Sequence, residues 1–193
     1  MTEKKPSFLR ASVIAVVVVA ATGLGVGSCI DATLVSTVNC PPFEDFQKVS
    51  PVLEQRCGTL DCHGNTARPL RLYGNVGLRA PDPDHADDPN YYPGGKTPTT
   101  ENEQMLNYRA VCALEPELMD KVMKKTVLDD TGQPATPDIL TFVRKPRLSE
   151  KHKGGRIWDQ GKPGDRCLTA WLNASDYEPG KFEDSDCKDE LNP

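Results

Sequence analysis

The most apolar stretch of the chain lies near its start, where residues 13–21 read VIAVVVVAA. A segment containing Lys4, Lys5 and Arg10 precedes it, and the small-residue stretch TGLGVGS follows. This apolar run is too short for a helix that crosses a bilayer, which needs about 20 residues. A cationic start, a short apolar core and a small-residue end are typical of a cleavable export signal. The pattern predicts that residues 1–28 are a signal peptide and take no part in the fold.

Helical patterns recur further along the chain. Ser50 and Pro51 predict a helix over residues 50–56, because serine is a good N-cap and proline is tolerated in the first turn. Residues 43–49 before it predict one or two additional turns. Two later segments each carry an apolar stripe and predict helices, Leu114–Lys125 and Asp165–Asn173.

The remaining segments are rich in turn-forming residues, with 17 prolines and 15 glycines in the whole chain. Residues 68–79 predict a short strand or extended turn, and residues 80–104 a long exposed loop. Residues 181–193 are acidic and predict a frayed tail apart from Cys187. The sequence therefore predicts a mostly α-helical, loop-rich domain over residues 43–180.

The residues VGSC that end at Cys29 resemble the lipobox of bacterial lipoproteins, in which an aliphatic residue and two small residues precede a cysteine. The resemblance implies that cleavage falls before Cys29 and that its thiol carries a diacylglycerol. Residues 29–42, which show no periodicity, would then be a spacer between the membrane and the domain.

Charge narrows the classes of partner. Residues 1–28 hold three of the 23 Lys and Arg residues and one of the 28 Asp and Glu residues, which leaves 20 basic and 27 acidic residues in the mature chain. A net charge of −7 argues against nucleic acid as a partner, because neutralising phosphates requires clustered positive charge.

Cysteine is frequent, with seven in the chain, which is typical of an oxidising compartment. If Cys29 carries lipid, six remain: Cys40, Cys57, Cys62, Cys112, Cys167 and Cys187. They allow two or three disulfides, and their even number does not distinguish these cases. The pairs that we expect, linking the later helices and the two ends of the domain, are Cys112–Cys167 and Cys40–Cys187.

One motif in the sequence indicates a chemical function. Residues 57–64 read CGTLDCHG, a C-x4-C-H-G, whereas haem c is usually attached at C-x2-C-H. In that motif two thiols form thioethers with the haem vinyl groups and the adjoining histidine binds the iron. The segment resembles the widened motifs of some bacterial c-type cytochromes, which implies covalent haem c on Cys57 and Cys62 with His63 as the proximal ligand. A small disulfide loop between the two cysteines is the alternative.

The order of elements resembles that of class I cytochrome c domains. There, a helix ends at the haem motif, a loop supplies the distal ligand, and a C-terminal helix with an aromatic residue packs across the first helix. Trp171 stands in the matching final helix, and His152 stands in the loop before it. The resemblance implies a cytochrome c-like fold with His152 as the distal ligand. Three methionines are rivals for that role: Met105, Met119 and Met123.

Together these features predict a haem c-binding electron-transfer lipoprotein of the cell envelope. It would be held to the outer membrane or cell surface, rather than the inner membrane, through the lipid on Cys29. It would pass electrons to redox partner proteins and catalyse no reaction of its own. The alternative is a cofactor-free surface lipoprotein, stapled by disulfides, with a structural or binding role.

Overall fold

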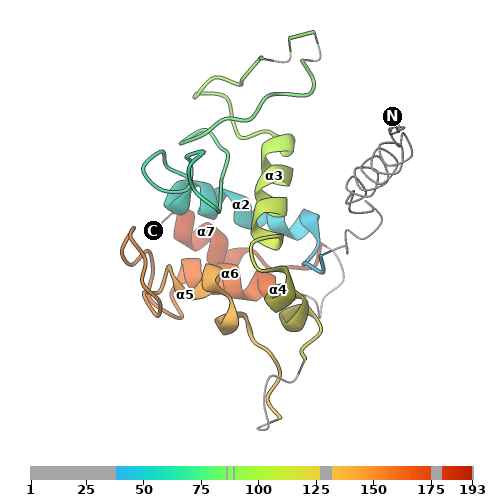
Figure 1. Ribbon diagram of the computed structural model, residues 1–193, viewed down its shortest axis with the longest axis vertical. Coiled ribbons are helices and arrows are strands. Elements are labelled where there is room, and N and C mark those ends of the chain that lie inside the picture. Colours follow the sequence, from blue (N-terminus) through green and yellow to red (C-terminus); the bar gives the residue numbers. More distant parts are fainter. Residues whose placement is uncertain (1–37, 86, 89, 127–131, 175–179, 193) are drawn as a thin grey trace, which may run out of the picture. The chain divides into compact units, whose positions relative to one another are not determined.

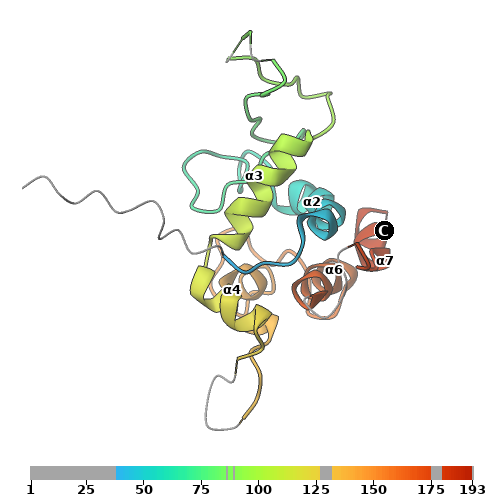
Figure 2. The same cartoon turned by 90° about the vertical axis from the view of Figure 1, so that its right-hand side faces the viewer.

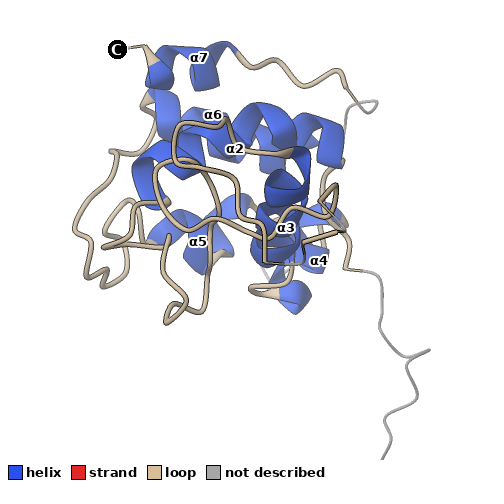
Figure 3. Ribbon diagram, turned by 90° about the horizontal axis from the view of Figure 1, so that it is seen from above, coloured by secondary structure: helices blue, strands red, loops and turns tan. Residues whose placement is uncertain are grey.

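The computed structural model describes residues 38–192, apart from residues 86, 89, 127–131 and 175–179. The predicted signal peptide and Cys29 lie outside the described residues. Residues from Val38 onward belong to one compact unit. Within the described ranges the unit is mostly helical and has no strand (Figure 3). Two disulfides cross-link it. None of the helices described there is long and apolar enough to cross a membrane.

Six α-helices and one 3-10 helix (η2) are described, and Figure 1 labels the α-helices. Their bounds in chain order are α2 Phe43–Cys57, α3 Glu101–Cys112, α4 Pro116–Met123, η2 Pro137–Ile139, α5 Thr141–Arg144, α6 Pro163–Leu172 and α7 Ser185–Leu191.

Helix α2 is a single element, so the predicted start at Ser50 is wrong. Ser50 is buried in the middle of the helix and its hydroxyl donates a hydrogen bond of 2.7 Å to Glu54 Oε1. Pro51 lies inside the helix, where it removes one backbone hydrogen bond. Burial of apolar residues around it offsets that loss, since Val49 and Val52 are almost fully buried.

Helix α3 lies where the predicted loop over residues 80–104 was expected to end. A capping box starts it, in which the Thr100 side chain accepts from the Glu103 N–H and the Glu103 carboxylate accepts from the Thr100 N–H. Met105 therefore belongs to a helix and not to the loop. The loop that remains, ending at Thr100, extends away from the helices in Figures 1 and 2.

The two later helices agree with the sequence patterns to within two residues at each end. Pro116 occupies the first turn of α4 and Pro163 the first turn of α6, the position where proline costs least. Trp171 of α6 is fully buried and packs against Phe46 of α2, with ring centroids 5.1 Å apart. The contact between the first and the later helix, expected from Trp171, is confirmed.

Two expectations about the periphery are wrong, and a third is decided between its two alternatives. Residues 185–191 form helix α7, which packs against α6 and α2 (Figure 2), so the tail is not frayed there. Residues 68–79, predicted as a short strand or an extended turn, form turns and no strand, with two isolated bridges, Thr59 with Gly77 and Tyr73 with Leu78. The expected pairs Cys112–Cys167 and Cys40–Cys187 are replaced by two others, Cys40–Cys112 and Cys167–Cys187.

The disulfides are local to neighbouring elements. Cys40, just before α2, is bonded to Cys112 at the end of α3, and Cys167 of α6 is bonded to Cys187 of α7. The first bond ties the predicted spacer into the domain, since Cys40 falls within residues 29–42. The domain therefore begins a few residues earlier than the sequence indicated.

Candidate functional site

The cysteine–histidine motif follows directly from the end of α2. Cys57 is the last residue of that helix, and the chain then makes a tight turn. The Cys62 N–H donates to the Thr59 carbonyl at 2.9 Å, and the His63 N–H donates to the Cys57 carbonyl at 2.8 Å. The two residues that widen the motif lie at the tip of the turn, where Leu60 is 61% exposed. The turn thus returns His63 to the end of α2 despite the longer spacing.

Close backbone packing holds this turn in place. The Gly58 carbonyl oxygen lies so near Gly64 and Gly77 that a Cβ on either residue would stand 2.0 Å or 1.9 Å from it. Neither glycine has a positive φ, so both are needed for close approach and not for an unusual backbone conformation. The glycine of the C-H-G motif is therefore a packing requirement of the turn.

His63 is oriented by its own chain. Its Nδ1 lies 3.0 Å from the Leu70 carbonyl oxygen, which can only accept, so Nδ1 carries the proton and Nε2 keeps its lone pair. Burial lowers the pKa of His63 below its ordinary value and outweighs the hydrogen bond to Leu70, which acts in the opposite direction. The ring is thus a neutral imidazole near pH 7, which is the form that binds metals.

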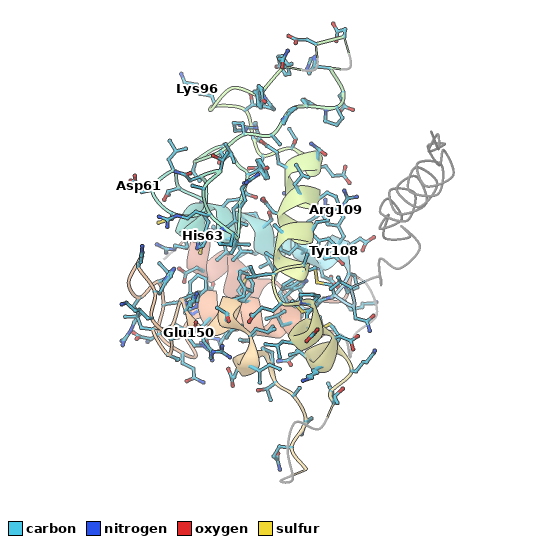
Figure 4. The ribbon with its side chains drawn as sticks, in the orientation of Figure 1. Asp61, His63, Lys96, Tyr108, Arg109 and Glu150 are labelled. Atoms are coloured by element: carbon cyan, nitrogen blue, oxygen red, sulfur yellow. A yellow bond between two sulfur atoms is a disulfide. The ribbon has the colours of Figure 1, made fainter. Side chains whose placement is uncertain are left out.

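His152 faces His63 from a different part of the chain. It stands in the loop of residues 145–162, called the His152 loop below, between α5 and α6. The two imidazole centroids are 6.2 Å apart and the ring planes differ by only 14°. In Figure 4, His63 lies above the loop that also carries Glu150. The structure therefore brings together the two histidines that the sequence resemblance paired.

The His152 ring is oriented in the same manner as the His63 ring. Its Nδ1 lies 2.8 Å from the Gly155 carbonyl oxygen, so Nδ1 again carries a proton and donates it to that carbonyl. Among the described residues, neither Nε2 has a hydrogen-bond partner. Two imidazoles that are both anchored through Nδ1 thus lie opposite each other.

Two adjoining cavities open beside the pair, and both are lined by His63 and His152. The first, of 210 Å³, is mainly apolar and reaches the end of α2. The second, of 540 Å³, opens at the surface among basic side chains. The apolar lining of the first includes Cys57, Leu70, Leu114, Phe142 and Pro146. The charged lining of the second is Asp61, Arg68, Lys145, Lys151 and Lys153.

The sequence patterns did not predict most of the residues that form the apolar wall of the first cavity. It comes from the starts of α4 and α5, which a polar contact holds together: Glu115 accepts from the Thr141 N–H at 2.6 Å and from its hydroxyl at 2.7 Å. The apolar segment around Phe142 was visible in the sequence, but its spacing gave no sign that it faces the motif.

Cys57 and Cys62 are not bonded to each other, and both carry free thiols. Cys57 lines the apolar cavity and Cys62 the open one, so each thiol borders the space between the histidines. Burial raises the pKa of the Cys57 thiol to about 12, so it is protonated at neutral pH. The small disulfide loop that the sequence left open is not formed.

The three methionines do not compete with His152 in this arrangement. Met119 is buried in the core and Met123 packs against it, while Met105 lies on α3. None of the three lines either cavity.

The chain's third histidine, His85, makes its contacts with residues outside this site. The His85 ring contacts the Tyr91 ring at a tilt of 41°, with centroids 3.7 Å apart, and His85 Nε2 lies 4.0 Å from a carboxylate oxygen of Asp82. Throughout the part of the chain that the structure describes, no group of three or more His, Cys, Asp or Glu side chains could hold a bare metal ion.

No family model, curated protein or solved structure matches this chain. The site is thus defined by its own geometry: two stacked imidazoles, two free thiols, and a space with an apolar part and a basic mouth.

Proposed function

We propose that the chain is an electron-transfer protein with a cytochrome c-like domain that binds one haem c. In this proposal Cys57 and Cys62 carry the haem through thioethers, and His63 and His152 are its axial ligands. The observation that carries the proposal is the pair of facing imidazoles, 6.2 Å apart between centroids.

The distance between the ring centres suits one iron between them; the rings are stacked, so ligation would also require both Nε2 atoms to turn toward the metal. Metal–imidazole bonds are about 2.0–2.1 Å and the ring centre lies about 1.1 Å from the bonded nitrogen, so two ligands across one metal have centroids about 6.3 Å apart. The observed 6.2 Å agrees with this value. Simple stacking of two rings would not require both to anchor Nδ1 and leave Nε2 without a partner.

Anchoring of Nδ1 is the usual support for a metal-binding histidine. A hydrogen bond from the second ring nitrogen to a backbone carbonyl fixes the tautomer and the ring orientation, and it makes the ligating nitrogen more basic. The Leu70 and Gly155 carbonyls supply this support for His63 and His152 respectively.

The lining of the space suits a porphyrin in particular. A porphyrin supplies four nitrogens to its iron, so the protein needs to add only two axial ligands. It has an apolar body and two carboxylates at one edge. The apolar wall around Leu70 and Phe142 fits the body, and the mouth with Arg68, Lys145 and Lys151 fits the carboxylates.

The ligand set defines the chemistry. Bound haem would supply a one-electron redox centre, and with His63 and His152 both holding its iron the site would suit electron transfer rather than catalysis. Imidazole in place of methionine sulfur lowers the reduction potential, because Met/His ligation raises it. With a lipid on Cys29, the domain would exchange electrons with redox partners at the cell envelope.

The direct test is to express the mature chain in an exporting host that has cytochrome c maturation. The expected product has a Soret band that stays with the protein after acid–acetone extraction, and an intact mass that includes one haem. A product with the two disulfides, free Cys57 and Cys62 and no haem would overturn the proposal and favour the cofactor-free alternative.

Histidine variants separate the ligand roles. His152→Ala should keep covalent haem but change from a low-spin to a high-spin spectrum and bind CO when reduced. His63→Ala should lower haem attachment, because the proximal ligand is lost. His85→Ala is the matched control and should retain the wild-type spectrum. An unchanged spectrum in His152→Ala would show that His152 is not the distal ligand.

A further inference from the structure

The His152 loop is attached at both ends to a single buried carboxylate, that of Asp165. Near its start, Arg147 donates from Nε to Asp165 Oδ1 at 2.5 Å and from Nη2 to Oδ2 at 3.1 Å. Near its end, the Gly161 N–H donates to Oδ2 at 2.7 Å. Asp165 is only 2% exposed and stands in the first turn of α6. One side chain thus closes the loop that presents His152.

Burial and two-point contact make the Arg147–Asp165 ion pair rigid. The Arg147 side chain is 7% exposed and the Asp165 side chain 3%, so water competes little for their hydrogen bonds. Two donors of one guanidinium reach two oxygens of one carboxylate, which fixes direction as well as distance. A negative side chain in the first turn of α6 also interacts favourably with the helix dipole. The anchor therefore belongs to the helical core and not to the surface.

The loop has other contacts as well: Trp158 is buried in the hydrophobic core, Ile157 packs against that core, and Arg147 also pairs with Asp138. Arg144 pairs with Glu150, but both side chains are more than a third exposed, and such pairs are weak. The Ile157 N–H donates to the Pro146 carbonyl at 2.9 Å, which closes the loop on itself without fixing it to a helix. The Asp165 anchor is the contact that ties the loop to α6 at both ends.

We propose that Asp165 is a positioning residue for His152, because it anchors both ends of the loop and so sets the distance between the His152 and His63 rings. This inference rests on the proposed haem site and assigns Asp165 no contact with the haem. When the anchor is lost, the loop opens, His152 leaves the axial position for part of the time, and that position becomes accessible to other ligands.

The test compares haem-loaded Asp165→Asn with Glu190→Gln. Glu190 is a matched control, since it also accepts from a backbone N–H of the first turn of α6, that of Gly164 at 3.0 Å. Its ion pair with Arg56, at 2.7 Å, does not involve the His152 loop. Both variants remove a negative charge that contacts the first turn of α6, but only Asp165 also contacts the His152 loop.

Asp165→Asn should retain covalent haem and show a mixed-spin spectrum that added imidazole returns to low spin. Its reduced form should bind CO with an apparent affinity roughly tenfold above that of the wild type, because the fraction of open loop sets that affinity. Glu190→Gln should keep the low-spin spectrum and the wild-type affinity for CO. Arg147→Lys, which keeps the charge but loses the two-point contact, should give a smaller change in the direction of Asp165→Asn.

Three results would overturn the inference. The first is a fully low-spin Asp165→Asn protein with wild-type CO affinity, and the second is an equal effect of Glu190→Gln. The third is failure of both Asp165→Asn and Arg147→Lys to fold, because the anchor would then support the whole fold rather than the loop. Absence of haem from the wild type would instead refute the proposed function.

Discussion

A methyl group added to the glycine of the motif should disrupt the turn that carries His63. In Gly64→Ala the new Cβ would lie 2.0 Å from the Gly58 carbonyl oxygen, 2.9 Å from its carbonyl carbon and 3.0 Å from the carbonyl carbon of Thr59. All three are backbone atoms, so no side chain can rotate away to make room. The turn itself has to move.

The size of the effect follows from that displacement. The closest carbon–oxygen contacts in proteins are about 3.3 Å, so relief requires a backbone shift of more than about 1 Å. Overpacking of this kind costs about 1–3 kcal/mol, and a clash with backbone places Gly64→Ala near 3 kcal/mol. For a domain of this size the midpoint of thermal unfolding should fall by about 6–12 °C.

Urea and thermal unfolding of the oxidised mature chain, followed by far-UV circular dichroism, measure this change. Gly95→Ala is the matched control, because a Cβ at Gly95 meets nothing within 4 Å. That variant should stay within about 0.5 kcal/mol of the wild type or gain slightly from lower chain entropy. If the two variants differ by less than about 0.5 kcal/mol, the close packing around the Gly58 carbonyl does not exist in solution.

Three further changes test the rest of the domain. Replacing both cysteines of Cys40–Cys112 by serine should lower the free energy of unfolding, measured in urea, by about 4 kcal/mol, because the disulfide closes a loop of 72 residues. The same change at Cys167–Cys187, which closes a loop of 20 residues, should lower it by about 3 kcal/mol. Equal losses would contradict this chain-entropy argument. Arg79→Met should cost about 3–5 kcal/mol in the same assay, because it leaves the fully buried Glu103 carboxylate without its ion pair; a loss below about 1 kcal/mol would refute the reasoning. Burial raises the pKa of Glu54 above its ordinary 4.5, although Thr99 and Ser50 donate hydrogen bonds to it, so its ionisation opposes folding increasingly as pH rises above about 4.5. Glu54→Gln should therefore gain stability relative to the wild type between about pH 4.5 and 7 and show no such trend below that range, which unfolding curves across pH will confirm or contradict.

Helix α3 shows why part of the fold could not be predicted from the sequence. Its capping box, Thr100 to Glu103, was visible, but the helix places two polar residues on its buried face. Glu103 is buried because Arg79 pairs with it, and Asn107 is buried because its amide bonds both the N–H and the carbonyl of Tyr73. These partners lie 24 and 34 residues away, so the apolar stripe that signals a packed helix is missing.

Helix α7 was missed for a related reason. Residues 185–191 read SDCKDEL, which looks like a solvated tail. Its order comes from partners on other helices: the disulfide from Cys187 to α6, and the contacts of Glu190 with Arg56 of α2 and with the Gly164 N–H of α6. Spacing along the chain does not reveal such pairs, and for the same reason it did not reveal the disulfide connectivity.

The helices α4 and α6 were predictable because their signals are local. Each has a proline in its first turn and an apolar stripe that ends in the core, and both features can be read within about three turns. The meeting of His63 and His152 was expected only from a resemblance in the order of elements. The meeting of the two rings depends on three features at once: the turn after α2, the loop before α6 and the contact between those two helices.

The sequence departs most from a haem c motif in the spacing between Cys57 and Cys62. The fold accommodates the two additional residues. Leu60 and Asp61 occupy the outer tip of a turn, and the hydrogen bond from the His63 N–H to the Cys57 carbonyl closes it. The distance from the end of α2 to the His63 ring is therefore set by this bond and by the packed glycines, and not by the number of residues between the cysteines. Ligand geometry and covalent attachment are thus separate requirements. The spectrum of His152→Ala tests the first, and the haem content of the wild type after maturation tests the second.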